Sequence, residues 1–300
     1  STLQKALILS GMGEICDRPE DAQVIDKSDQ GYTLLNSVDG FPALIPDPWL
    51  NGRLTALHAS SDIWASGARV ISSQAIVTLP DVSSADQIEI LSQTLGGVRS
   101  ALNEQGALLI GGHTMESRKP KATPTALDLQ LSLSVLGKTP KSAQPWCKGP
   151  ICPGDILFLS RELGSGVIFA GAMKGACNPW HLDKCLNILS QSQHNKIDRL
   201  LALQEQSSGC INACTDITGF GLLGHLNEML HLSPSVTIDL WMDNIPIYEG
   251  ARELLNEGIE STLTSSNKSA LVSLQDKIRL IFSSEDGNKV SRETFKTLII

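Results

Sequence analysis

Basic residues and long apolar runs are both scarce in this chain. Its 24 lysine and arginine residues are outnumbered by 32 aspartate and glutamate residues, for a formal net charge of -8. Binding of nucleic-acid phosphates requires clustered Lys and Arg, so we expect no nucleic-acid partner. No apolar run approaches the roughly 18 residues of a membrane-spanning helix. Residues 1–10 also lack the basic start and cleavage site of a signal peptide.

Closely spaced cysteine pairs are absent as well. The seven cysteines are odd in number and scattered, and neither Cys147 with Cys152 nor Cys210 with Cys214 has CxxC spacing. Structural zinc sites usually have tighter ligand pairs, so the cysteines do not predict zinc. Their pattern favours a reduced protein located in the cytoplasm.

The apolar pattern that is present predicts a layered α/β or α+β protein. Strands are expected at 71–79, 107–110 and 127–137, and they interleave with helices that begin near residues 49 and 84. Residues 138–154 contain four prolines and two glycines, which predicts a linker between domains 1–137 and 155–300. In the second domain we expect strands at 155–160 and 210–214 and helices at 167–174, 179–189 and 196–206. Residues 283–300 are polar and aperiodic, and we expect them to be atypical or truncated.

Two acidic residues stand out in the segment 34–67. Asp39 ends an extended run, and Asp62 lies late in the helix that follows. A carboxylate near the end of a helix opposes the macrodipole, so it calls for a compensating partner, such as a bound metal ion. Asp21 precedes the first predicted strand, where on its own it reads as part of a solvated acidic turn.

Two glycine-containing motifs carry further polar groups. Asp216 precedes the glycine-rich start of a helix in TDITGFG, where taken alone it is a helix cap. Gly111 and Gly112, followed by His113 and Thr114, form a loop at a predicted strand end, where backbone amides can approach a phosphate. The histidines, His58 among them, show no partner spacing that indicates catalysis.

Together these motifs resemble the selenophosphate synthetase family, the selenide, water dikinases. The resemblance rests on SVDGF at 37–41, DPWLNGRLTALHASSDIWASGA from Asp47, GGHT from Gly111 and TDITGFGLLGHLNEM from Thr215. It implies a two-domain α/β (α+β) fold like that of aminoimidazole ribonucleotide synthetase. It also implies a homodimer in which the first domains form a β-barrel, with ATP and Mg²⁺ held between subunits and domains.

The resemblance also implies the site residues and the reaction. Asp21, Asp62 and Asp216 resemble magnesium ligands, and Asp62 also serves the nucleotide. ATP contacts are implied at Asp39, Gly112, His113 and Thr114. Since Mg²⁺ prefers oxygen ligands and bridges phosphate oxygens, such carboxylates can converge favourably when the metal is present. The implied reaction is phosphorylation of selenide by ATP, which yields selenophosphate, AMP and phosphate.

The chain departs from the family pattern in ways that leave alternatives open. The reactive cysteine or selenocysteine and the lysine of the family are expected upstream of Ser1, in a longer protein that could carry a flavin-dependent NADH oxidoreductase domain. His58 stands where the family usually has asparagine, and the later DPQTSGG loop is missing. One alternative is a catalytically silent nucleotide-binding paralogue with a regulatory or assembly role. Another is a different kinase or ligase of the same fold, acting on a small acid or amide.

Overall fold

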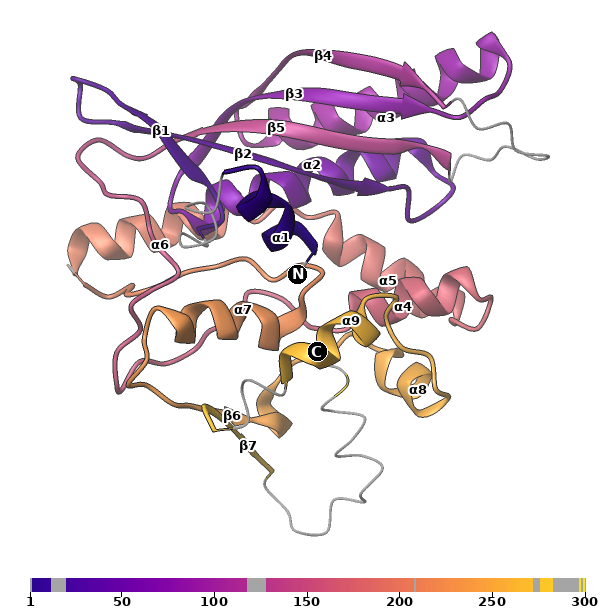
Figure 1. The fold of residues 1–300 in the computed structure, drawn as a ribbon. Coiled ribbons are helices and arrows are strands. Elements are labelled where there is room, and N and C mark those ends of the chain that lie inside the picture. The colour runs from indigo at the N-terminus through magenta and orange to yellow at the C-terminus, as the bar shows by residue number, and fades with distance from the viewer. Residues whose placement is uncertain are drawn as a thin grey trace.

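The computed structural model describes residues 2–11, 20–117, 128–207, 209–271, 276–282, 297 and 299. A short helix, α1 (Thr2–Leu9), precedes a sheet-containing domain and a second, mainly helical domain (Figure 1). Among the described residues, no helix is both long and apolar enough to cross a membrane. The segment 283–300, which we expected to be atypical, lies outside the described residues except for positions 297 and 299.

The first domain is built on a five-stranded sheet. Its strands are β1 (Gln23–Lys27), β2 (Thr33–Pro42), β3 (Arg69–Leu79), β4 (Leu108–Glu116) and β5 (Gln130–Lys138), in the order β1-β2-β5-β3-β4. All neighbouring pairs are antiparallel except β3 and β4, which are parallel. Along β5, Leu131, Leu133 and Val135 are buried and alternate with more exposed residues, which is the pattern of a half-buried strand.

Two long helices, α2 (Pro48–Ala65) and α3 (Ser84–Glu104), cover one face of this sheet (Figure 1). The side chain of Asp47 caps α2 by accepting the Leu50 N–H at 2.9 Å. The helices cross closely at a glycine: a Cβ on Gly97 would lie 1.8 Å from the Trp49 carbonyl oxygen. The predicted helices and the predicted strand at 71–79 are therefore confirmed.

The opposite face of the sheet exposes apolar side chains. Val38 and Ile76 are 64% and 42% exposed, and Leu108 and Ile110 on the edge strand β4 are 63% and 59% exposed. Within the described residues of one chain, the sheet is open and ends at β1 and β4. A closed barrel is therefore not a feature of the single chain.

The second domain contains most of the helices. These are α4 (Ser165–Met173), α5 (Pro179–Leu189), α6 (His194–Gln206), α7 (Gly221–His231), α8 (Ala251–Asn256) and α9 (Thr264–Leu271). The strands β6 (Ile238–Trp241) and β7 (Ile278–Ile281) pair in parallel, and a 3-10 helix, η3 (Met242–Asn244), follows β6. The helices predicted from apolar periodicity are thus confirmed, and the mixed α/β, two-domain architecture is present.

Two strand predictions in the second domain are wrong. Residues 155–160 and 210–214 are not paired as strands. Phe158 remains 87% exposed, and the Cys214 N–H donates instead to the carbonyl of Cys147 at 2.9 Å. β-prone side chains alone do not make a strand, because the backbone also needs a partner strand.

The segment between the domains is packed against both of them. Trp146 is 7% exposed, and its backbone N–H donates to the Ser66 carbonyl at 3.0 Å. Its indole lies against Gly67, where an added Cβ would come within 2.6 Å of the ring. The backbone hydrogen bond from the Cys214 N–H to the Cys147 carbonyl joins the next residue of this segment to the second domain. The composition that predicted a linker therefore belongs to an ordered connection.

Candidate metal centre

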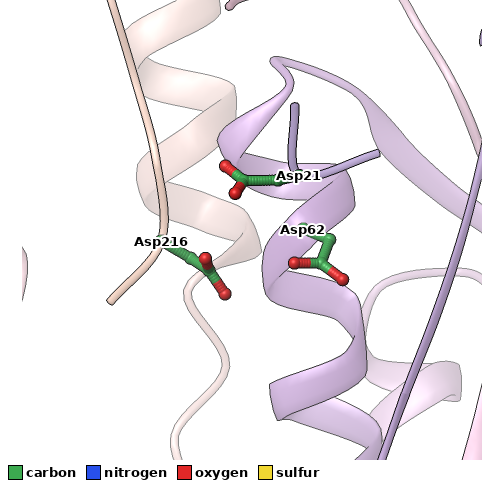
Figure 2. A group of neighbouring side chains, drawn as sticks. All are labelled: Asp21, Asp62 and Asp216. Carbon is green, nitrogen blue, oxygen red and sulfur yellow. The ribbon is translucent and has the colours of Figure 1, made fainter. Parts of the chain in front are cut away.

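Three carboxylates from distant parts of the sequence meet between the two domains. Asp21 lies just before β1, Asp62 in the last turn of α2, and Asp216 in the segment that leads to α7. One oxygen from each lies within 4.8 Å of the others. Figure 2 shows the three side chains approaching from three separate segments. Of the sequence-predicted site residues, these three are the ones that the structure brings together.

The alignment of β2 with α2 orients the first-domain side of this centre. Ser37 and Asp39 are two residues apart on β2, while His58 and Asp62 are four apart on α2, so each pair shares one face of its element. The Ser37 hydroxyl donates to Asp62 Oδ2. His58 Nε2 lies 2.8 Å from Asp39 Oδ2. Strand β2 therefore orients Asp62 through Ser37, and it places Asp39 in contact with His58.

Hydrogen bonds across the domain boundary complete the arrangement. The Ser61 hydroxyl on α2 lies 2.6 Å from Asp216 Oδ2. From the second domain, the Thr215 hydroxyl lies 3.3 Å from Asp21 Oδ1. Each domain thus positions a carboxylate that the other supplies.

Burial and mutual repulsion change the acidity of these groups. Burial, followed by the charge of Asp216, raises the pKa of Asp62 to about 7. The same two causes raise the pKa of Asp21 to about 6, against the opposing effect of Lys148. Gathered carboxylates favour a cation that relieves their repulsion, and three carboxylate oxygens suit Mg²⁺ or a similar hard divalent ion. The donor set therefore fits the metal that the resemblance implies.

Asp39 and His58 form an ion pair beside the centre. Burial alone would raise the pKa of Asp39, but the hydrogen bond and charge of His58 outweigh it and lower that pKa. Burial would likewise lower the pKa of His58, but Asp39 outweighs it and raises that pKa. Sequence reasoning missed this partner of His58. The four-residue spacing between His58 and Asp62 was the available signal, because it places both side chains on one helix face.

The glycine motif lies elsewhere. Gly112, His113 and Thr114 were expected in a loop after a strand, but they continue the edge strand β4 in register with β3. A Cβ on Gly112 would lie 1.9 Å from the Ala75 carbonyl oxygen, so glycine permits this close pairing. Strands β5 and β3 separate β4 from β2, a span of about 14 Å at the usual strand spacing. Within one chain the motif is therefore not part of the acidic centre.

Lys148 is the residue of this region that sequence reasoning missed entirely. Its ammonium lies 2.7 Å from Asp21 Oδ1, although its position in the chain indicated only a linker. Burial would lower the pKa of Lys148, but its interactions with Asp21 and then Glu228 outweigh burial and raise that pKa. No local pattern could reveal this contact, because the partners are far apart in the sequence.

The fold and this centre define the class of protein. The model of the AIR synthase related protein N-terminal domain matches residues 19–138, and that of the C-terminal domain matches residues 153–279. The solved structure of hydrogenase maturation protein HypE in complex with ATP has the same fold, with a TM-score of 0.56 and 19% identity. That likeness covers 86% of this chain and 74% of the other. The chain thus has the two-domain architecture of AIR synthase related proteins.

Curated relatives narrow the class further. The selenide, water dikinase of Caldanaerobacter subterraneus subsp. tengcongensis is 34% identical over 249 residues, which cover 80% of this chain and 63% of the relative. That of Trichlorobacter lovleyi is 33% identical over 271 residues, covering 87% of this chain and 73% of the relative. The chain belongs to the selenide, water dikinase family. It spans less than two thirds of the length of several of the relatives that it matches.

Proposed function

We propose that this chain binds ATP with Mg²⁺ and supports phosphorylation of selenide to selenophosphate, with release of AMP and phosphate. The observation that carries the proposal is the convergence of Asp21, Asp62 and Asp216 between the two domains of a selenide, water dikinase family member. The HypE structure in complex with ATP supports nucleotide binding by this fold.

The residues of the centre divide the work of holding the nucleotide. Asp21, Asp62 and Asp216 would hold Mg²⁺, which supplies charge neutralisation to the phosphates when bound. Ser37 and Ser61 fix the orientation of Asp62 and Asp216 through their hydroxyls. Asp39 lies beside the centre, and its carboxylate would exchange its contact with His58 for a contact with the nucleotide. Catalysis then depends mainly on positioning and on charge compensation.

We further propose that Gly112, His113 and Thr114 serve the nucleotide of a second copy of this chain. The exposed apolar face of the sheet and its free edge strand β4 support a homodimer in which two sheets close a barrel. Such a closure would bring the motif of one copy toward the centre of the other, which one chain alone does not do.

The dimer is tested by replacing Ile76, which is 42% exposed on the central strand β3. Ile76→Asp is expected to weaken dimerisation by about a hundredfold, because an unpaired charge would be buried between the sheets. Analytical ultracentrifugation over a range of concentrations measures the change. Ile88→Asp is the matched control, because Ile88 is 69% exposed on α3, outside that face. A wild-type chain that stays monomeric at high concentration would refute the dimer.

The reaction is tested in two stages. Calorimetric titration of this chain with a non-hydrolysable ATP analogue is expected to show binding that requires Mg²⁺. Phosphorus NMR of the protein, supplied with ATP, Mg²⁺ and selenide, is expected to show AMP and selenophosphate. Binding without AMP would reject the reaction, and phosphate transfer to a small acid or amide would identify a different kinase or ligase of this fold.

One observation favours a second candidate. The Asp39 carboxylate, to which the resemblance assigns a contact with ATP, is engaged in an ion pair with His58. A catalytically silent member that binds nucleotide for a regulatory or assembly role fits this feature. The two-stage experiment separates the candidates, since the silent member binds the nucleotide and forms no AMP.

A further inference from the structure

Lys148 is a buried cation placed against the acidic centre. The residue is 5% exposed, and its ammonium lies 2.7 Å from Asp21 Oδ1 and 2.6 Å from Glu228 Oε2 on α7. The backbone is fixed too, because the Lys148 N–H donates to Glu20 Oε2 at 3.0 Å. A buried ammonium is costly unless it is paired, so both ion pairs matter for keeping this side chain inside.

The contacts of Glu228 extend this pairing back to the segment that carries Asp216. Glu228 Oε2 lies 3.6 Å from Nδ1 of His225, which is 3% exposed. The other ring nitrogen, Nε2, accepts the Thr218 N–H at 3.1 Å. In the neutral ring the proton is therefore on Nδ1, which faces Glu228. Polar contacts thus run from Asp21 through Lys148, Glu228 and His225 to Thr218, two residues beyond Asp216, and the contact between Glu228 and His225 is longer than a hydrogen bond.

We propose that Lys148 is a positioning residue that serves as the internal counter-cation of the metal centre. Its ammonium compensates Asp21 when the centre holds no divalent ion, and it competes with that ion for the same carboxylate. Glu228 holds the ammonium when Asp21 turns to the metal. The inference rests on the proposed function in one respect, that the three carboxylates hold a divalent ion.

The charges of the neighbouring groups explain why such a residue is useful. Three carboxylates within 4.8 Å repel one another, and one nearby ammonium removes part of that repulsion. The same ammonium repels an incoming divalent cation, so it lowers the affinity for the bare ion. A nucleotide brings its own negative phosphates, which offset that repulsion. Lys148 therefore favours occupation of the centre by metal and nucleotide together over metal alone.

The test measures binding of Mn²⁺ without nucleotide by electron paramagnetic resonance, at a pH well above the pKa values of Asp21 and Asp62. Lys148→Met is expected to bind Mn²⁺ about tenfold more tightly than wild type, because a nearby positive charge is gone. Lys148→Arg keeps the charge and is expected to retain the wild-type affinity. Lys184→Met is the matched control, because Lys184 is also ion-paired, with Glu249 at 2.5 Å, but is half exposed and outside the centre.

A purely structural role for Lys148 predicts the opposite result. Asp21 would lose its support in Lys148→Met, and Mn²⁺ binding would weaken; that outcome, or an unchanged affinity, overturns the proposal. If Lys148→Met does not fold, Glu228→Gln provides the second measurement. It is expected to weaken Mn²⁺ binding, because Lys148 then pairs with Asp21 alone, and tighter binding would contradict the proposal.

The outcomes also separate this inference from the proposed reaction. If Lys148→Met tightens Mn²⁺ binding while the wild-type protein forms no AMP from ATP and selenide, the counter-cation is supported and the reaction is rejected. If neither wild type nor Lys148→Met binds Mn²⁺, the counter-cation is rejected along with the metal centre itself.

Discussion

Replacement of Asp216 by asparagine is expected to weaken Mg²⁺-dependent binding of an ATP analogue by about a hundredfold or more. The reason is that Asp216 is the one carboxylate that the second domain contributes to the three of the candidate metal centre. The same substitution is expected to stabilise the metal-free protein by about 1 kcal/mol, because repulsion with Asp62 and Asp21 disappears. Calorimetric titration measures the first effect, and urea unfolding with a chelator measures the second.

The two opposite effects distinguish a metal ligand from a residue that merely supports the fold. A structural role for Asp216 predicts lower stability in the metal-free protein, in addition to any loss of binding. Asp26→Asn is the matched control, because Asp26 is exposed on β1 and its Oδ1 accepts only the neighbouring Lys27 N–H among the bonds described. Unchanged Mg²⁺-dependent binding in Asp216→Asn would remove Asp216 from the centre.

The metal-free protein is expected to lose stability as the pH rises from about 4.5 to about 7. The folded-state pKa values of Asp21 and Asp62 are raised from 3.8 to about 6 and about 7, so the folded protein holds protons that the unfolded chain has released. Stability falls with pH wherever the folded state binds more protons, and the total loss is expected to be about 5 kcal/mol. Urea unfolding at a series of pH values, with a chelator present, measures it.

Other shifted groups do not reverse this trend. Burial would raise the pKa of Asp39, but His58 outweighs burial and lowers that pKa. Burial would also raise the pKa of Glu228, but His225 and Lys148 outweigh it and lower that pKa. Their stabilisation is lost only as the pH falls below about 4.5. For His58, Asp39 overcomes burial and raises the pKa, so its stabilisation is lost as the pH rises above 6.5, in the same direction as the two aspartates.

Mg²⁺ is expected to counteract the loss, because it binds the ionised carboxylates and displaces their protons. The stabilisation by Mg²⁺ should therefore increase through the same pH range. Asp62→Asn should flatten the fall in the metal-free protein, since it removes the group with the higher pKa. Stability that is constant or rising from about 4.5 to about 7 without metal would contradict the raised pKa values of Asp21 and Asp62.

Local patterns were sufficient to predict much of the fold. The helical stripe of α2 and the apolar, β-branched run of β3 are properties of contiguous residues, and both elements formed as predicted. The strand predictions at 155–160 and 210–214 failed because pairing depends on a partner that local sequence does not specify. The prediction of a loop at 111–114 failed for a related reason, since the two glycines allow β4 to continue close beside β3.

The candidate centre was predicted only in part. Asp21, Asp62 and Asp216 were named from the family resemblance, and the structure places them together. Strand and helix periodicity could have predicted that the hydroxyls of Ser37 and Ser61 face the centre. Lys148 could not, because its ion pairs with Asp21 and Glu228 arise when three distant segments are brought together by the fold.

The ordered connection between the domains bears on how a ligand enters and leaves. The backbone N–H of Trp146 donates a hydrogen bond to the Ser66 carbonyl in the first domain. The carbonyl of the adjacent Cys147 accepts one from the Cys214 N–H in the second. Opening the domains like a hinge at this connection would instead separate the Ser61 hydroxyl from Asp216 and withdraw Lys148 from Asp21. We therefore expect a ligand to enter and leave by movement of segments within each domain, while the two domains keep a fixed relative orientation.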